Sequence, residues 1–285
     1  MAHSNLFAIW NFHKELERTG FTLKGHSRGG ERSGFLIPSI SLMFDAGVRT
    51  HQTPNHILIT HCHCDHSFEL PTILAGDWKN PTNIYTPVDP KIIINFIHSS
   101  FTLMNNGKKK SPPFTVHQVK PGDTFHFTEG KKNFEVEVFQ CYHTVDTVGY
   151  GISEIRNKLK EEFMGKEGRE LAALKKEGID ICYPEKVSNI TYLCDTSIDV
   201  FNNSKIFDYT HIMVECTILF EDQKESAYKN GHIYWGDLLP IVKSHPENQF
   251  ILIHFSTRYS DDEIVSFFES EMKTHSIDNV FPWIN

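Results

Sequence analysis

The sequence predicts a single layered α/β domain over residues 1–285, and three observations support this fold class. Short apolar segments of β type recur along the chain, and stretches with a helix-like spacing of apolar residues lie between them. No internal repeat of fixed short period and no low-complexity linker divides the chain. Strands that alternate with helices are typical of layered α/β architectures.

Six short segments have the apolar, β-rich composition of buried strands. They are residues 34–44, 56–60, 82–87, 189–194, 211–215 and 249–255. Residues 124–139 predict a β-hairpin, because alternating residues flank a turn that contains Gly130.

Two stretches have helical features. Apolar residues in the Lys/Glu-rich segment 156–178 recur at intervals of three or four, which predicts a charged helical insert over residues 156–180. Near the C-terminus, Ser260 followed by Glu263 forms a capping box. The spacings that support these helices are Leu159 to Phe163, Leu171 to Leu174, and the stripe Ile264, Phe267, Phe268 and Met272.

The charge of the chain restricts its possible partners. A formal net charge of −8 does not indicate a general nucleic-acid binder, which usually has a basic surplus. A polyanion would have to meet a local basic patch, although each candidate patch also fits a solvated loop or helix face. The candidates are residues 107–113 with Lys108, Lys109 and Lys110, the pair Lys131 and Lys132, and residues 156–178.

The sequence also indicates a compartment. No apolar run approaches the roughly eighteen residues of a membrane span, and the N-terminus lacks the features of a secretory signal. Six scattered cysteines without disulfide-framework spacing favour a reducing intracellular compartment, the cytoplasm or the nucleus. They are Cys62, Cys64, Cys141, Cys182, Cys194 and Cys216.

The segment THCHCDH, residues 60–66, directly follows a predicted strand. In an extended chain His61, His63 and Asp65 would point to one side, while His66 could turn toward a second centre. Imidazole and carboxylate groups are common ligands of Zn²⁺, so the segment predicts a site for two metal ions. The alternative is a histidine-rich surface loop.

Cys62 and Cys64 occupy the intervening positions. If the alternate residues face the metal ions, both thiols point away from them, and we expect small buried fillers rather than thiolate ligands.

Further ligand-type residues follow other predicted strands. His143 comes after FEVEVFQCY, Asp195 after NITYLC, and His254 near the end of QFILIHF. Each residue alone would also fit a structural or surface role, but together they could complete the metal site.

These residues and several rarer motifs resemble one family. The pattern HxHxDH, a later His, an Asp after a strand and a final strand-end His resembles the metallo-β-lactamase superfamily. Within it the chain resembles the short-form tRNase Z, the endoribonuclease that processes tRNA 3′ ends, and its plant-type branch in particular. The motifs are VGY (148–150), CDT (194–196), VECT (214–217), GHIY (231–234) and IHFSTRYS (253–260), with 25–39 and 158–179 also similar.

The resemblance implies a four-layer αβ/βα sandwich, two Zn²⁺ ions per chain, with Mn²⁺ possible, and often a homodimer acting on precursor tRNA. It implies that His61, His63 and His143 hold one zinc ion, that Asp65, His66 and His254 hold the other, and that Asp195 bridges the two. His232 matches the family's proton donor, oriented by Glu215, so the candidate catalytic residues are Asp65, His232 and Glu215. Candidate substrate contacts are Lys108, Lys109, Lys110 and Arg258.

The chain departs from the family at three places. Cys194 stands where many relatives have Gly, and Ile233 and Tyr234 stand where small or hydroxyl residues often follow the proton donor. The Gly/Pro-rich arm that grips tRNA in bacterial relatives is not recognisable, and the Lys/Glu segment takes its place.

The expected activity is hydrolysis that removes the 3′ trailer of precursor tRNA, leaving a 3′-OH on the tRNA and a 5′-phosphate on the trailer. A ribose O3′ leaves poorly as an alkoxide, so a general acid such as His232 is required. The rival interpretations are a binuclear-zinc phosphodiesterase for a small or cyclic nucleotide and a catalytically silent RNA-binding protein of the same fold.

Overall fold

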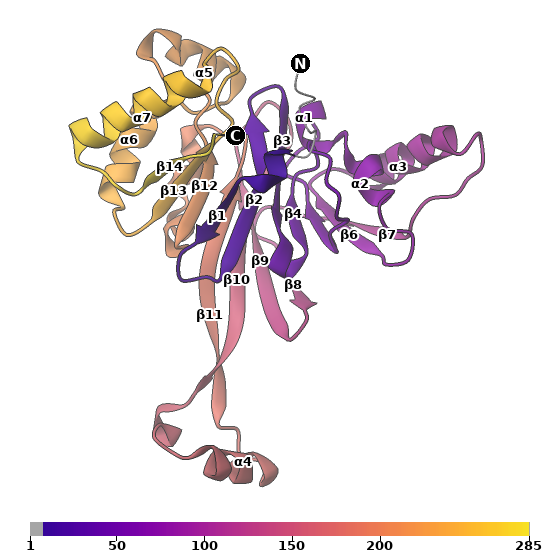
Figure 1. The fold of residues 1–285 in the computed structure, drawn as a ribbon, viewed down its shortest axis with the longest axis vertical. Coiled ribbons are helices and arrows are strands. Elements are labelled where there is room, and N and C mark those ends of the chain that lie inside the picture. The colour runs from indigo at the N-terminus through magenta and orange to yellow at the C-terminus, as the bar shows by residue number, and fades with distance from the viewer. Residues whose placement is uncertain (1–7, 285) are drawn as a thin grey trace.

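The computed structural model describes residues 8–284 and contains two seven-stranded sheets (Figure 1). The first sheet runs in chain order from β1 to β7, and the second runs in the order β14-β13-β12-β11-β10-β9-β8. The first sheet consists of β1 (His13–Leu16), β2 (Phe21–Arg28), β3 (Arg32–Ile37), β4 (Leu42–Phe44), β5 (His56–Leu58), β6 (Thr82–Thr86) and β7 (Phe114–Gln118). The second consists of β8 (Thr124–Glu129), β9 (Lys132–Gln140), β10 (Val148–Leu159), β11 (Cys182–Leu193), β12 (His211–Glu215), β13 (Gln249–Ile253) and β14 (Val280–Pro282).

Helices connect the strands and cover the sheets. The α-helices are α1 (Cys64–Ser67), α2 (Leu70–Leu74), α3 (Pro90–Met104), α4 (Gly168–Lys176), α5 (Lys224–Asn230), α6 (Trp235–Ser244) and α7 (Asp261–His275). The 3₁₀ helices are η1 (Ala8–Asn11), η2 (Pro38–Ile40), η3 (Glu161–Phe163), η4 (Ile198–Asn202), η5 (Ser204–Asp208) and η6 (Glu221–Gln223). No helix among residues 8–284 is long and apolar enough to cross a membrane.

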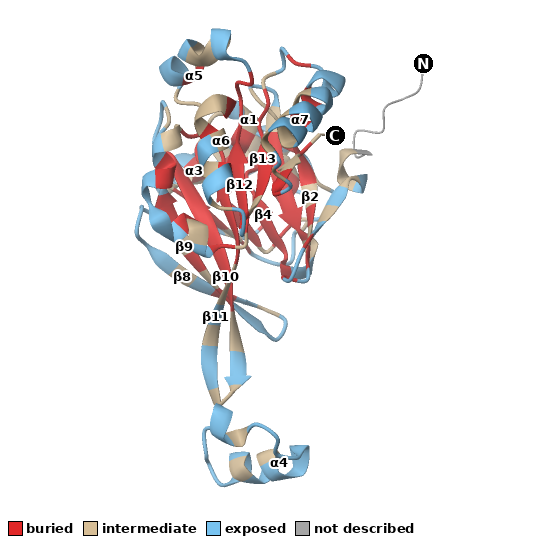
Figure 2. Cartoon of the chain, turned by 90° about the vertical axis from the view of Figure 1, so that its left-hand side faces the viewer, coloured by how far each residue is buried: buried red, intermediate tan, exposed pale blue. Residues whose placement is uncertain are grey.

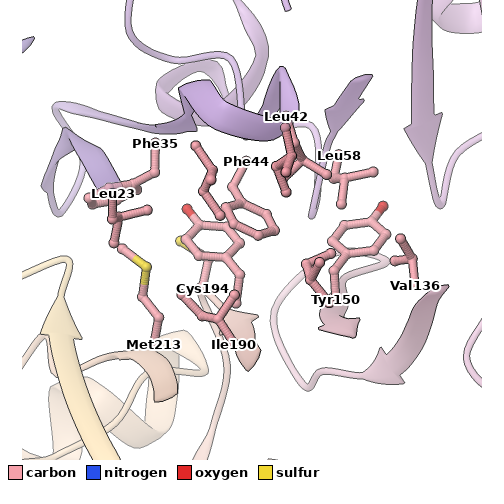
Figure 3. Packing of buried hydrophobic residues seen from close by; sticks show 14 of the residues in the cluster. Leu23, Phe35, Leu42, Phe44, Leu58, Val136, Tyr150, Ile190, Cys194 and Met213 are labelled. Carbon is pink, nitrogen blue, oxygen red and sulfur yellow. The ribbon is translucent and has the colours of Figure 1, made fainter. Parts of the chain in front are cut away.

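The main hydrophobic core lies between the two sheets (Figure 3). Phe44 and Leu58 contribute from the first sheet, and Tyr150 and Met213 contribute from the second. The ring of Phe44 stacks on Tyr192 with centroids 4.7 Å apart. Burial of such large apolar surfaces is the main driving force that holds two sheets together.

Each sheet is covered on its outer face by helices, so the molecule has four layers (Figure 1), and the strands between the helices are largely buried (Figure 2). Apolar residues of α2 and α3, such as Leu70 and Ile97, pack on the first sheet. Residues of α6 and α7, such as Leu238 and Phe268, pack on the second. The predicted αβ/βα sandwich is therefore confirmed.

Two local predictions agree with the structure. Strands β8 and β9 form the expected hairpin. The capping box of Ser260 and Glu263 opens α7, whose residues Ile264 and Phe268 are buried. These features are specified by neighbours in the sequence.

The Lys/Glu-rich segment differs from the prediction (Figure 1). Strands β10 and β11 continue beyond the sheet as a two-stranded extension, and we call residues 156–185 the arm. Leu159 pairs with Cys182 in this ladder, so Leu159 and Phe163 do not share one α-helix, and Phe163 ends the 3₁₀ helix η3 instead. Helix α4 occupies only the tip. Cross-strand charges explain the strand, because Lys158 Nζ lies 2.6 Å from Glu185 Oε1.

Candidate metal centre

The predicted ligands come together at one edge of the two sheets. Strands β4 and β5 are parallel, and β9, β11, β12 and β13 all run in one direction, so their carboxyl ends share an edge within each sheet. A hydrogen bond of 3.0 Å from Val148 N to Thr60 O joins the two sheets there. The ionisable residues that end or follow these strands are Asp45, His61, His143, Asp195, Glu215 and His254. We call this edge the site edge.

The first group of ligand atoms comes from His61, His63, His143 and Asp195, whose atoms lie within 4.8 Å of one another. His61 Nε2 lies 3.0 Å from His63 Nδ1 and 3.7 Å from Asp195 Oδ2, and His143 Nε2 lies 3.7 Å from that same oxygen. Four ligands of a tetrahedral Zn²⁺ at about 2.1 Å would lie about 3.4 Å apart. The spacing therefore fits one metal ion.

The second group comes from Asp65, His66 and His254. Asp65 Oδ2 lies 3.3 Å from His66 Nε2 and 3.7 Å from His254 Nε2. Asp195 reaches this group through its other oxygen, because Oδ1 lies 3.1 Å from His254 Nε2. Its Oδ2, which faces the first group, also lies 3.6 Å from His66 Nε2, so Asp195 lies between the two groups, as a bridging carboxylate would.

The path of the chain through residues 61–66 differs from the predicted extended strand. Strand β5 ends at Leu58, and Asp65 and His66 lie in α1. Cys62 is half-buried and packs against the core below α2, but Cys64 is exposed, so its predicted role as a buried filler is wrong. The reason is that the helix starts at Cys64 and ends the alternation of a strand.

Four histidines are fixed by a hydrogen bond at Nδ1, which leaves Nε2 facing the site. The partners are Thr60 Oγ1 for His61 at 3.0 Å, Asp45 Oδ2 for His66 at 2.8 Å, Gly231 O for His143 at 3.0 Å and Thr217 Oγ1 for His254 at 3.0 Å. Such partners set the tautomer and orientation of metal-binding imidazoles.

Three further observations fit a bound cation. The Nε2 atoms of His66 and His254 are buried and have no hydrogen-bond partner among the described residues. Burial and then the nearby His66 lower the pKa of His61 to about 2, so its imidazole is neutral and has a free lone pair. Burial alone would raise the pKa of Asp195, but His254 and His66 outweigh it and keep the carboxylate ionised. A buried carboxylate beside the neutral imidazole of His61 is suited to a divalent cation.

Asp45, which the sequence reasoning missed, is fully buried beneath the first and second groups. Its carboxylate accepts hydrogen bonds from Thr60 N at 2.8 Å, His66 Nδ1 at 2.8 Å and Tyr192 OH at 2.9 Å. The same signal that indicated Asp195 could have found it, because Asp45 directly follows the apolar strand β4.

Glu215 forms a comparable buried centre at the end of β12. Its Oε1 accepts from His232 Nδ1 and from Thr196 N, both at 2.8 Å. Its Oε2 accepts from Thr217 Oγ1 at 2.5 Å and from Ile233 N at 3.2 Å. Burial lowers the pKa of His232, but the Glu215 carboxylate outweighs burial and raises it to about 9.

His232 lies beside the ligand groups. Its ring centroid is 5.0 Å from that of His143 and 5.4 Å from that of His254. An open cavity of about 250 Å³ borders His63, Asp65 and His232. A neighbouring hollow of about 190 Å³ borders His232, Ser226 and Arg258. The imidazolium is therefore accessible to a ligand that enters beside the metal-binding groups.

Cys194 packs in the core between the sheets and also touches the site. Its Sγ lies 3.3 Å from Asp195 Oδ1 and 3.7 Å from His66 Nδ1. Burial raises the pKa of this thiol well above its ordinary value. Cys194 thus contacts the bridging carboxylate as a neutral thiol.

The four predicted substrate contacts lie in two different places. Arg258 lies at the rim of the site, where its Nη1 donates to Gln223 Oε1 at 3.0 Å. Lys108, Lys109 and Lys110 lie between α3 and β7, next to the amino end of β6, because Thr82 N bonds to Pro113 O. They are therefore at the edge opposite the site edge.

No protein-family model matches the sequence. The structure is similar to the crystal structure of the human tRNase Z short form (ELAC1), with a TM-score of 0.56, 19% identity and coverage of 83% of this chain and 93% of the other. It is equally similar, at a TM-score of 0.56 and 15% identity, to the metallo-β-lactamase fold protein YhfI from Bacillus subtilis, with coverage of 90% and 93%. The chain has the metallo-β-lactamase fold.

Sequence comparison finds relatives that are named tRNase Z or ribonuclease Z. The chain is 26% identical to tRNase Z TRZ1 of Arabidopsis thaliana over 260 residues, which cover 88% of this chain and 91% of the relative. It is 28% identical to the nuclear ribonuclease Z of Triticum aestivum over 171 residues, 58% of this chain and 94% of the relative. The resemblance to short-form tRNase Z is confirmed at the level of sequence similarity.

Proposed function

We propose that this protein is a metal-dependent endoribonuclease that removes the 3′ trailer from precursor tRNA by hydrolysis. The similarity to tRNase Z proteins supports the reaction class. The observation that carries the proposal is the hydrogen bond of 2.8 Å between His232 and the buried Glu215, beside the His/Asp groups and bordering the open cavity.

Two divalent cations are proposed, Zn²⁺ or alternatively Mn²⁺. His61, His63 and His143 would hold one, Asp65, His66 and His254 would hold the other, and Asp195 would bridge them. When bound, such a pair activates the attacking water and neutralises charge on the phosphate. Asp65 contributes at the second position, where its carboxylate faces the cavity.

The leaving group explains the need for His232. In the proposed reaction, the attacking water has lost one proton to solvent, the resulting hydroxide oxygen bonds to phosphorus, and the bond from phosphorus to O3′ breaks. His232 donates its proton to O3′, which leaves a 3′-OH on the tRNA and a 5′-phosphate on the trailer. Glu215 fixes the imidazole by its bond to Nδ1 and favours the protonated form.

The tRNA body is proposed to contact residues far from the cleavage site. Arg258 at the rim is suited to a phosphate near the scissile bond. The twelve-residue strand β10 starts near the site edge and leads into the arm, so the arm tip lies roughly 40 Å away. Only an extended polyanion could reach the arm or Lys108–Lys110 while its end occupies the site.

A homodimer is also proposed. Large apolar side chains are exposed on the helical layer of the first sheet, including Phe68 at the end of α1 and Ile92 and Leu103 on α3, the last being 84% exposed. Such a cluster is typical of a protein interface. The six free cysteines support the expectation of a reducing compartment.

The direct test is cleavage of a 3′-extended tRNA transcript with mapping of both product ends. The proposal predicts a cut at the tRNA 3′ end, a 3′-OH on the tRNA and a 5′-phosphate on the trailer. Hydrolysis of a cyclic nucleotide without cleavage of the transcript would favour the small-nucleotide phosphodiesterase. Binding of the transcript without cleavage, by protein that retains its metal ions, would favour the silent RNA-binding protein.

A further inference from the structure

We infer that the hydroxyl of Thr217 is a positioning residue that couples the proton-donor pair to the second metal position. The inference rests on the proposed function for the identity of the metal site. Thr217 lies two residues after Glu215, at the site edge, and is buried. The sequence motif VECT contains it, but sequence reasoning gave it no role.

One oxygen atom of Thr217 contacts both parts of the site. Oγ1 lies 2.5 Å from Glu215 Oε2 and 3.0 Å from His254 Nδ1. It also lies 3.0 Å from the main-chain oxygen of His254 and 3.5 Å from His232 Nδ1.

The directions of these bonds follow from the number of hydrogens. The hydroxyl has one hydrogen, and the nearby charged Glu215 carboxylate is its strongest acceptor. Oγ1 then accepts from Nδ1–H of His254. That tautomer leaves a lone pair on His254 Nε2, the buried atom that has no partner among the described residues and faces Asp195 Oδ1.

The backbone around His254 needs such support. His254 has a φ of +61°, a left-handed conformation that costs free energy in a residue with a side chain. Ser256 N donates to Thr217 O at 3.1 Å, so the same threonine holds the turn after β13. On the other side, a Cβ atom at Gly29 would lie only 3.0 Å from His254 O, so a larger residue there would require the turn to shift by a few tenths of an ångström.

An equivalent arrangement exists at the first metal position. Thr60 Oγ1 lies 3.0 Å from the Asp45 carboxylate and 3.0 Å from His61 Nδ1. In both places a buried carboxylate, a threonine hydroxyl and a ligand histidine form a chain. This repetition within one molecule supports a metal-directed role for Thr217.

The test is a titration of metal-free protein with Zn²⁺ in competition with a chromophoric chelator. Two matched pairs isolate the hydroxyl: wild type against Thr217→Val, and Thr217→Ser against Thr217→Ala. In each pair, the variant without a hydroxyl should bind the second equivalent of Zn²⁺ about 10–100-fold more weakly. This is the usual effect of removing the hydrogen-bond partner of a ligand histidine. The first equivalent should change by less than about threefold.

A second measurement separates this inference from the proposed function. Hydrolysis of bis(p-nitrophenyl) phosphate needs no general acid, because nitrophenolate leaves readily, and it involves no tRNA. Thr217→Ala should lose kcat at limiting Zn²⁺ and regain it at excess Zn²⁺, with KM unchanged. Failure to cleave tRNA would contradict only the proposed function.

Three outcomes would overturn the inference. They are wild-type affinity of Thr217→Val for both equivalents, equal weakening of both equivalents, and equal behaviour of Thr217→Ser and Thr217→Ala. If Thr217→Val does not fold, as judged by thermal unfolding without metal, the Ser and Ala pair decides, because these variants differ only in the hydroxyl.

Discussion

Two buried carboxylates organise the site from opposite sheets, and they do so differently. Asp45, in the first sheet, bonds directly to His66 and through Thr60 to His61. Glu215, in the second sheet, bonds directly to His232 and reaches His254 through Thr217. We call Asp45 with its partners the first centre and Glu215 with its partners the second centre. Both histidines of the first centre are proposed metal ligands. The second centre serves one ligand, His254, and the proposed proton donor, His232.

The comparison shows how the kind of contact with a buried carboxylate can prepare a histidine for proton donation or for metal binding. The direct contact with Glu215 outweighs burial and raises the pKa of His232 to about 9. His61, which meets Asp45 only through a hydroxyl, has a pKa lowered to about 2 by burial and by His66. Direct contact with Glu215 therefore favours a protonated His232, and contact with Asp45 through Thr60 leaves His61 neutral. Direct contact does not by itself exclude a ligand role, because His66 contacts Asp45 directly and keeps its Nε2 atom toward the proposed metal ligands.

The largest effect is expected from Asp45→Asn, which breaks the first centre. The side-chain amide cannot accept from His66, Thr60 and Tyr192 together, so both metal positions should be lost and cleavage should fall to background. Removal of one partner from a buried charged network costs about 3–5 kcal/mol of stability. Metal analysis and thermal unfolding would measure both effects, with the exposed Asp262→Asn as control. Normal metal content in Asp45→Asn would contradict this view of the first centre.

His232→Ala should separate the two tasks of the second centre. Because His232 is assigned to proton donation, the variant should keep both metal ions but lose about 10²–10⁴-fold in rate on precursor tRNA. His63→Ala is the matched control and should lose metal and activity together. Loss of zinc from His232→Ala would show that this histidine is a ligand.

Glu215→Gln should give a smaller, mixed defect. A neutral amide keeps the size of the side chain but cannot accept from His232 and Thr217 as a carboxylate does, so both proton donation and the second metal position should weaken. We expect about 10–100-fold weaker binding of the second Zn²⁺ and a lower rate at saturating Zn²⁺. Chelator competition and single-turnover kinetics measure the two parts. A defect in only one of them would mean that Glu215 does not couple the two tasks.

Replacing Lys108, Lys109 and Lys110 together with alanine should weaken tRNA binding without slowing single-turnover chemistry. These residues lie opposite the site edge, so they can act only on the body of the substrate. For each lysine that pairs with a phosphate, its replacement should reduce the slope of log affinity against log salt by about 0.9. The same replacement of Lys166, Lys175 and Lys176 is the comparison, because the arm is the other candidate contact. Unchanged affinity in the first triple variant would leave the arm as the main candidate.

The smallest effect is expected from Cys194→Ala. The thiol is a weak donor to Asp195 Oδ1, so the rate and Zn²⁺ affinity should change by less than about tenfold. The small cavity should cost about 1 kcal/mol of stability, measured by thermal unfolding. Cys182→Ala in the arm is the control. Complete loss of zinc would make Cys194 a ligand.

The sequence predicted the elements whose signals are local. Apolar runs located the strands, the pair Ser260 and Glu263 located α7, and strand-end positions located the seven proposed ligands. Glu215 and His232 came from the resemblance to short-form tRNase Z. The structure brings these nine residues together. Position at a strand end was informative because parallel strands in both sheets end at the same edge.

Contacts between distant segments could not be predicted in this way. The local spacing predicts a helical insert over residues 156–180, but pairing of Leu159 with Cys182 overrides this spacing in the part of the arm next to the sheet. Cys64 is exposed because α1 replaces the extended chain. Asp45 and Thr217 carried a strand-end signal, but their importance depends on His66 and His254, which are far away in the sequence.

The most direct test of the central claim uses precursor tRNA in which the bridging O3′ at the cleavage site is replaced by sulfur. A thiolate leaves without protonation, so the general acid becomes unnecessary while the metal ions remain essential. If the second centre prepares His232 as proton donor, this substrate should largely restore cleavage by His232→Ala but not by His63→Ala. Equal impairment of His232→Ala on the oxygen and sulfur substrates, with both metal ions present, would contradict the claim.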